Sequence, residues 1–241
     1  MGIEIGRVIE ELKKQGFSQG AQVLSATVSS LEDTGLIPHE LQNGSTPEAA
    51  SELETEWNRQ VDKFVELGFH NVLKLSEEKY RESLPKFEAQ PEEYKGRFDV
   101  PVLVETRIPA RKQVKLAGIR DFLGGLKGAD WKDPRGIKTP KKPYGAWLQD
   151  GSKYLDVSVD DVRKRLDGDE VADNLFDATA LVIAYPEILD KHSIDVPGAR
   201  VGSVRAPFFD RWLDEVELGC SWSGDAARDF GSGSRGSKVS S

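Results

Sequence analysis

Residues 100–107 read VPVLVETR, and this stretch decides the class of fold. Valine occupies every second position from Val100 to Val104, which is the period-two pattern of a β-strand. The chain before it carries apolar residues at helical spacing instead. This change predicts an α+β protein, in which an N-terminal helical region is followed by a mixed, mainly antiparallel sheet packed with helices.

Two well-marked helices are expected before the strand. The first begins with Pro47, at a position that suits proline, and ends at Gly68. The second begins at Ser76, a favoured cap residue, and ends at Pro85. One apolar stripe along the first helix predicts a buried face made up of Leu53, Trp57, Val61, Phe64 and Val65.

The second half of the chain mixes strand and helix patterns. Further strands are expected at residues 144–148, 154–157, 199–205 and 215–222. The Asp150-Gly151 pair predicts a hairpin turn, and Ser158 is expected to cap a short helix. The most apolar helix begins near Leu175 and is interrupted at Pro186, so we expect it to lie against the sheet.

Composition divides the chain into three parts. Residues 1–90 are expected to form the helical N-terminal region, with two short helices within residues 3–36, and residues 98–230 the α+β domain. Residues 231–241 are mostly Gly and Ser, a composition typical of flexible segments. We therefore expect the tail to be disordered.

The charge distribution is uneven along the chain. Between Arg107 and Lys142 lie eleven Lys and Arg but only three Asp, whereas the whole chain has 33 basic and 41 acidic residues and a net charge of −8. Such an asymmetry indicates either an anion-binding surface or an internal charge match between two parts of the fold.

The basic stretch is our candidate binding site, as a loop that follows a strand and is held by a rigid scaffold. We expect an anionic ligand or an acidic protein partner, bound without catalysis. Aromatic side chains beside cations can stack on ligands, so we include Trp147 among the expected ligand-binding residues. The expected ligand-binding residues are Arg107, Arg111, Lys112, Lys115, Lys138, Lys141, Lys142 and Trp147.

Two alternatives stay open at this point. The protein could be an enzyme acting on a phosphorylated or nucleotide-like small substrate, which requires a convergent pocket containing a carboxylate of shifted pKa. The basic loop could also dock within the chain, on the acidic helices around Glu48 to Glu56 or Glu77 to Glu93. The sequence does not rank these alternatives.

No catalytic motif, metal site or cofactor site is predicted. The three histidines, His39, His70 and His192, lack the spacing of metal ligands. Cys220 shares a strand face with apolar residues and is expected to be a packed core thiol. One acidic cluster consists of Asp167, Asp169, Glu170 and Asp173. Its residues do not have the spacing of a calcium-binding loop, so we expect a solvated loop and helix cap.

The expected compartment is the cytoplasm. No apolar run approaches the roughly 18 residues of a membrane span, and Glu4 stands where a signal peptide would be basic. A single cysteine agrees with a reducing environment. We expect no membrane partner. A nucleic-acid partner is possible but not favoured, because the net charge of the chain is negative.

Four segments within Phe64 to Gly236 resemble a family of uncharacterised bacterial proteins, a domain of unknown function. These segments read FVELGFHNVLKLSEEKYRESL, VPVLVETRIPARKQVKLAG, ALVIAYPEILDKHSIDVPGARVG and LGCSWSGDAARDFGSGSRG. The resemblance implies a shared fold, with a helical region, a Val-rich strand, a helix ending in Tyr-Pro-Glu and a closing Gly-Cys-x-Trp element. It implies no catalytic residues.

Overall fold

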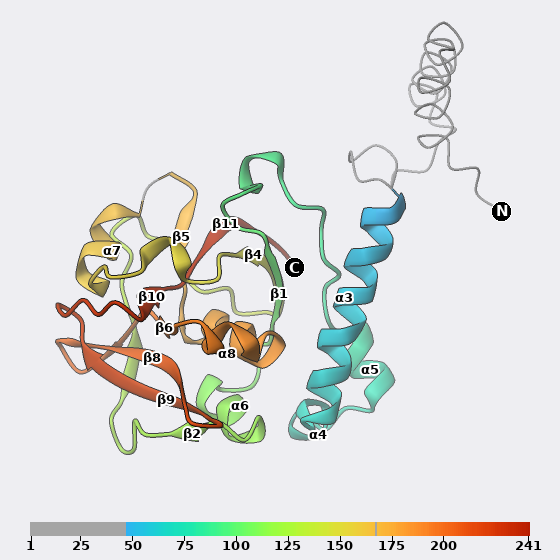
Figure 1. The fold of residues 1–241 in the computed structure, drawn as a ribbon. Helices are drawn as coiled ribbons and strands as arrows, with labels where there is room; N and C mark the ends of the chain where they lie inside the picture. Colours follow the sequence, from blue (N-terminus) through green and yellow to red (C-terminus); the bar gives the residue numbers. More distant parts are fainter. Residues whose placement is uncertain (1–46, 167) are drawn as a thin grey trace, which may run out of the picture. The chain divides into compact units, whose positions relative to one another are not determined.

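The computed structural model describes residues 47–166 and 168–241, which form an α+β protein with two mainly antiparallel sheets (Figure 1). Residues from Glu56 to Ser241 form one compact unit, which is the part considered below. The helices expected within residues 3–36 lie outside the described residues. Among the residues that are described, no helix combines the length and the apolarity needed to cross a bilayer.

The expected helices are confirmed where the structure describes them. Gly68, with φ 75°, follows the end of the first helix, and the side chains of Ser76 and Ser158 cap the helices after them by accepting from backbone N–H groups three residues on. Pro186 begins a separate 3-10 turn. The α-helices are α3 (Pro47–Glu66), α4 (Phe69–Val72), α5 (Glu77–Glu82), α6 (Ala110–Leu116), α7 (Val159–Arg165) and α8 (Leu175–Ala184).

The strands form a four-stranded and a seven-stranded sheet. The smaller sheet has the order β1-β4-β11-β5, with β1 (Val100–Val104), β4 (Tyr144–Leu148), β5 (Glu170–Ala172) and β11 (Ser234–Ser240). The larger sheet has the order β10-β6-β8-β7-β3, and β9 and β2 continue it from β8. Its strands are β2 (Arg120–Asp121), β3 (Gly128–Asp130), β6 (Ser193–Asp195), β7 (Ala199–Val201), β8 (Arg205–Trp212), β9 (Glu215–Trp222) and β10 (Phe230–Ser232).

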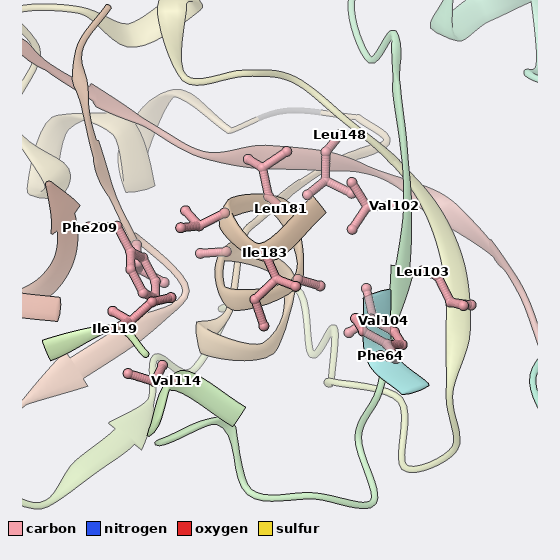
Figure 2. Close-up of a cluster of buried hydrophobic side chains, with 14 of the residues drawn as sticks. Phe64, Val102, Leu103, Val104, Val114, Ile119, Leu148, Leu181, Ile183 and Phe209 are labelled. Atoms are coloured by element: carbon pink, nitrogen blue, oxygen red, sulfur yellow. The ribbon is translucent and has the colours of Figure 1, made fainter. Parts of the chain in front are cut away.

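The apolar helix α8 is the centre of the core. As Figure 2 shows, it lies with Leu181 and Ile183 between Val102 and Leu148 of the smaller sheet and Phe209 of the larger one. Its residues from 177 to 184 are all buried. The prediction that this helix packs against a sheet is therefore confirmed, and the helix in fact contacts both sheets.

The edge of the smaller sheet is covered by α3. The buried side chain of Gln60 donates to the carbonyl of Pro101 at 2.8 Å and accepts from the backbone N–H of Leu103 at 2.8 Å. Its amide thus supplies both bonds that a neighbouring strand would supply, since an amide has both a donor and an acceptor. Trp57, Val61 and Phe64 of the same helix belong to the core of the sheet domain.

The expectation of a disordered tail is wrong. Residues 234–240 form β11, which pairs with β4 on one side and β5 on the other. The Gly-rich composition predicted disorder wrongly, because these glycines let neighbouring atoms pack closely against the strand. A Cβ on Gly233 would lie 2.4 Å from a carboxylate oxygen of Asp173, and one on Gly236 would lie 2.1 Å from the ring of Tyr94.

Two local predictions are also wrong. Residues 152–154 form a 3-10 turn and not the start of a strand, because the Asp150 carboxylate accepts from the backbone N–H of Ser152 at 3.0 Å and from its hydroxyl at 2.6 Å. Asp150-Gly151 therefore begins this turn and is no hairpin. The basic stretch is no continuous loop either, since it contains α6, β2 and β3.

Candidate functional site

The arginines of the basic stretch are held by carboxylates of the same chain. Arg107 forms a two-pronged pair with the buried Glu105, with Nε–Oε1 2.9 Å and Nη2–Oε2 2.7 Å, and also donates to the hydroxyl of Ser83 at 2.8 Å. Its guanidinium lies over the ring of Tyr80, 5.5 Å from the centroid. Arg107 therefore joins the end of β1 to α5.

Arg111 has a similar structural role. It donates to Asp121 at 2.7 Å and to the carbonyl of Gly124 at 2.7 Å, so that α6 holds the loop that follows β2. The other two arginines of the stretch also have carboxylate partners, because Arg120 pairs with Glu215 and Arg135 with Asp133. All four arginines are therefore parts of the scaffold.

The seven lysines of the stretch are all exposed and, unlike the arginines, form no ion pair with another described residue: Lys112, Lys115, Lys127, Lys132, Lys138, Lys141 and Lys142. The register of the sheet brings two chain segments that carry three of them to the same end of the sheet. Val104 at the end of β1 is opposite Tyr144 at the start of β4, so the chain after β1 and the chain before β4 leave the same end of the sheet. The start of α6, with Lys112, and the pair Lys141 and Lys142 come from this end.

Trp147 is not part of this group. It is opposite Pro101, three residues along β4 from Tyr144, or about 10 Å from the end where the lysines lie. Its indole N–H donates to the carbonyl of Glu88 at 3.3 Å. With Phe87 and Lys238 it lines a cavity of about 40 Å³, which has room for little more than a water molecule.

A buried polar cluster lies at the start of α8, where sequence reasoning expected solvated carboxylates. Asp177 accepts from Arg235 at 3.2 Å, from the Asn174 side chain at 2.6 Å and from the hydroxyl of Tyr144. All these side chains are buried. The N-cap of α8 is Asn174, which forms a capping box with Asp177. The cluster thus ties α8 to β4 and β11.

Glu170 and Asp173 correct the prediction of a solvated acidic loop, because both are fully buried. Glu170 accepts from Lys153 at 2.6 Å, from Tyr154 at 3.0 Å and from Ser234 at 2.6 Å. Of the other two members of that predicted loop, Asp169 pairs with Arg97 at 3.0 Å, and residue 167 lies outside the described residues.

The carboxyl oxygens of Asp173 accept no hydrogen bond within the described residues. Burial raises the pKa of this carboxyl well above its usual range, and the neighbouring Asp177 carboxylate raises it further, against the opposing charge of Arg235. Burial likewise raises the pKa of Asp195 to about 7, against the opposing charge of Arg163. A neutral carboxyl avoids the cost of a buried charge, so the cluster is suited to holding strands together.

The carboxyl groups of Asp173 and Asp195, whose pKa values are raised by burial, lie beside Arg235 and Arg163. One cation of the basic stretch, Arg135, reaches this cluster and donates to the backbone carbonyl of Glu170 at 2.7 Å. Within the described part of the chain, no group of three or more His, Cys, Asp or Glu is placed to hold a metal ion. The sequence signal for the cluster is the glycine spacing of residues 231–236, a composition that by itself predicts disorder.

Cys220 is partly buried and packs against the core, as expected from its position in β9. Leu218, on the same face, is fully buried, whereas Trp222 at the end of the strand is 59% exposed. The thiol is therefore a packing group on a face that becomes exposed at the end of β9.

Comparison with known proteins gave no match to a family model, a curated protein or a solved structure. The resemblance to a family of uncharacterised bacterial proteins therefore stays a prediction.

Proposed function

We propose that the protein is a non-catalytic binding module that holds an anionic ligand or the acidic surface of a partner protein. The contacts would be made by the lysine set, which we define as Lys112, Lys115, Lys138, Lys141 and Lys142. The proposal is supported by a difference between the two kinds of cation in the basic stretch. Every arginine there has a carboxylate partner, and every lysine is exposed.

The two kinds of cation suit these two roles. Arginine offers a rigid fork that matches a carboxylate, and so it fixes a scaffold. Lysine is a mobile point charge that adapts to ligands of different shape. Exposed lysines near one end of a sheet also attract an anionic partner over about 8–10 Å at physiological salt, which raises the rate of association.

The proposal changes the set of residues expected from sequence. Arg107 and Arg111 are assigned to the scaffold, because each is already bonded to a carboxylate of low exposure. Trp147 is left out, because it lies along β4 and away from the lysines. The binding surface is thus built by lysines alone, with affinity that should depend strongly on ionic strength.

The test uses two chemically different probes, inorganic polyphosphate and a poly-glutamate peptide, titrated at low and physiological salt. We expect binding to at least one probe, with an affinity that falls steeply with salt. The double variant Lys141→Glu, Lys142→Glu should weaken binding by about tenfold or more, because each reversal replaces an attraction with a repulsion.

A matched control reverses the same number of charges outside the basic stretch. The variant Lys74→Glu, Lys79→Glu changes net charge equally and changes two exposed residues. It should keep most of the affinity of the parent chain. Equal losses in the two variants would show that only net charge matters, and unchanged affinity in the first variant would remove the lysine set from the binding surface.

A further inference from the structure

Four large apolar side chains are exposed on the β8–β9 hairpin and on the loop that follows β2, the strand paired with β9. Trp212 is 66% exposed and Leu213 is 83% exposed at the turn, and Phe122 and Leu126 are 54% and 45% exposed in the loop after β2. We call these four residues the hairpin patch. Exposed apolar groups gathered in one place are typical of an interaction surface, whereas single ones are common on any protein.

The two parts of the patch are linked by strand pairing, an ion pair and a ring contact. β2 pairs with β9, and Arg120 of β2 forms an ion pair with Glu215 at the start of β9. The same guanidinium lies over the ring of Phe122, 4.8 Å from its centroid. Trp212 is directly opposite Glu215 in the hairpin register. Arg111 fixes the rest of the loop through the carbonyl of Gly124. The patch is therefore preorganised.

Leu213 has a backbone conformation that leucine rarely adopts. Its φ is 56°, in the left-handed region that glycine and asparagine occupy in hairpin turns. The side chain is also the most exposed of the large apolar residues that the structure describes. Leu213 is thus a bulky apolar residue at a turn position that favours glycine or asparagine, and its side chain adds nothing to the core.

The charges around the patch are of both signs. Lys127 follows Leu126 in the loop, while Asp214 and Glu217 lie on the hairpin, and these three residues form no ion pair within the described part of the chain. A surface with apolar residues and both signs of charge can complement itself, because a two-fold axis brings the same patch of two copies together.

We propose that the hairpin patch binds the hairpin patch of a second copy of this chain, forming a symmetric dimer. Trp212, Leu213 and Phe122 form the apolar centre, and Lys127 of each copy faces Asp214 of the other. This self-association goes beyond the proposed binding function, because none of these residues belongs to the lysine set.

The decisive variant is Leu213→Gly, measured by sedimentation velocity from about 1 μM to about 1 mM protein, which covers weak and moderate dimers. Glycine removes the apolar side chain and also relieves the left-handed strain. We therefore expect the variant to remain monomeric while its melting temperature stays equal to or above that of the parent. A parent chain that is monomeric throughout this range overturns the proposal.

Charge exchange tests the pairing itself. Asp214→Lys and Lys127→Asp should each raise the dissociation constant by about tenfold, and the combined variant should restore most of the affinity, because the pair is re-formed with exchanged signs. Trp222→Ser is the matched control, since Trp222 is 59% exposed at the opposite end of the hairpin. A loss of association in this control equal to that of Leu213→Gly also overturns the proposal.

Discussion

Asp195 and Asp173 are carboxyl groups buried beside arginines without a direct ion pair to them. Burial raises the pKa of both. An acid whose pKa is raised in the folded protein keeps its proton in the folded state, so the folded state binds more protons than the unfolded one. Its contribution to stability is therefore present at low pH and is lost as the pH rises through the pKa of the folded state.

We expect the free energy of unfolding to fall by about 1–3 kcal/mol between pH 5 and pH 8, because Asp195 has a folded-state pKa of about 7. Asp195→Asn should flatten this dependence, since the amide does not ionise. Urea denaturation at several pH values measures it. The exposed Asp225→Asn is the control and should keep the slope of the parent chain. A slope unchanged in Asp195→Asn would assign the pH dependence to other groups.

Gln60 shows how one side chain can complete a sheet. Its amide bonds Pro101 and Leu103 at the open edge of β1, and it is buried beneath α3. Gln60→Ala should lower the free energy of unfolding by about 2–4 kcal/mol, because it leaves two buried backbone groups without partners and creates a cavity. Lys63→Ala, on the same helix with a half-exposed side chain that pairs with Glu66, should change it by less than about 0.5 kcal/mol.

At the scale of elements, the segment from β10 to β11 depends on three glycines. Gly231, Gly233 and Gly236 each lie where a Cβ would come within 2.4 Å of another atom, and for Gly231 that atom is the carbonyl oxygen of Gly151. Buried Ser234 and Arg235 lie between Gly233 and Gly236 and bond to Glu170 and Asp177. Steric fit and polar bonds together fix the register of this strand.

Gly233→Ala should therefore lower the free energy of unfolding by at least about 2 kcal/mol, because the new methyl group overlaps the Asp173 carboxyl in a packed interior. Gly125→Ala is the matched control, since a Cβ there meets nothing within 4 Å. Its change should stay within about 0.5 kcal/mol. Chemical denaturation compares the two. Similar values for both would mean that β11 does not pack as tightly as described.

For the whole molecule, β11 is an inner strand that joins the two halves of the smaller sheet. It lies between β4 and β5, and the adjacent β10 pairs with β6 of the larger sheet. The segment therefore takes part in both sheets in the described part of the chain. Loss of a central strand leaves two unpaired edges and exposes the core beneath it.

A chain truncated after Asp229 should lose its cooperative thermal transition and bind a dye that reports exposed apolar surface. Differential scanning calorimetry and dye fluorescence measure these two effects. A disordered tail would give the opposite result, with a transition close to that of the full chain. The control is truncation after Val239, which removes only the last residue of β11 and the residue that follows it.

Patterns of a few residues predicted the local elements well. Pro47 and Gly68 bound α3 because proline and glycine constrain the backbone locally, and the valines of β1 alternate because a strand has two faces. The lysines of the binding proposal were also visible in the sequence. The Asp150-Gly151 turn failed because a side-chain bond to Ser152 outweighed its hairpin tendency.

Local patterns along the chain were enough to predict the class of the fold, the caps of α5 and α7, the limits of β4 and β9, and the basic stretch between Arg107 and Lys142. These depend on neighbours along the chain. The folded structure was needed to show that the tail is a central strand, that Glu170 and Asp173 are buried, and that the arginines are paired with carboxylates while the lysines are not. Each of these depends on partners far away in the sequence, which composition and periodicity do not contain.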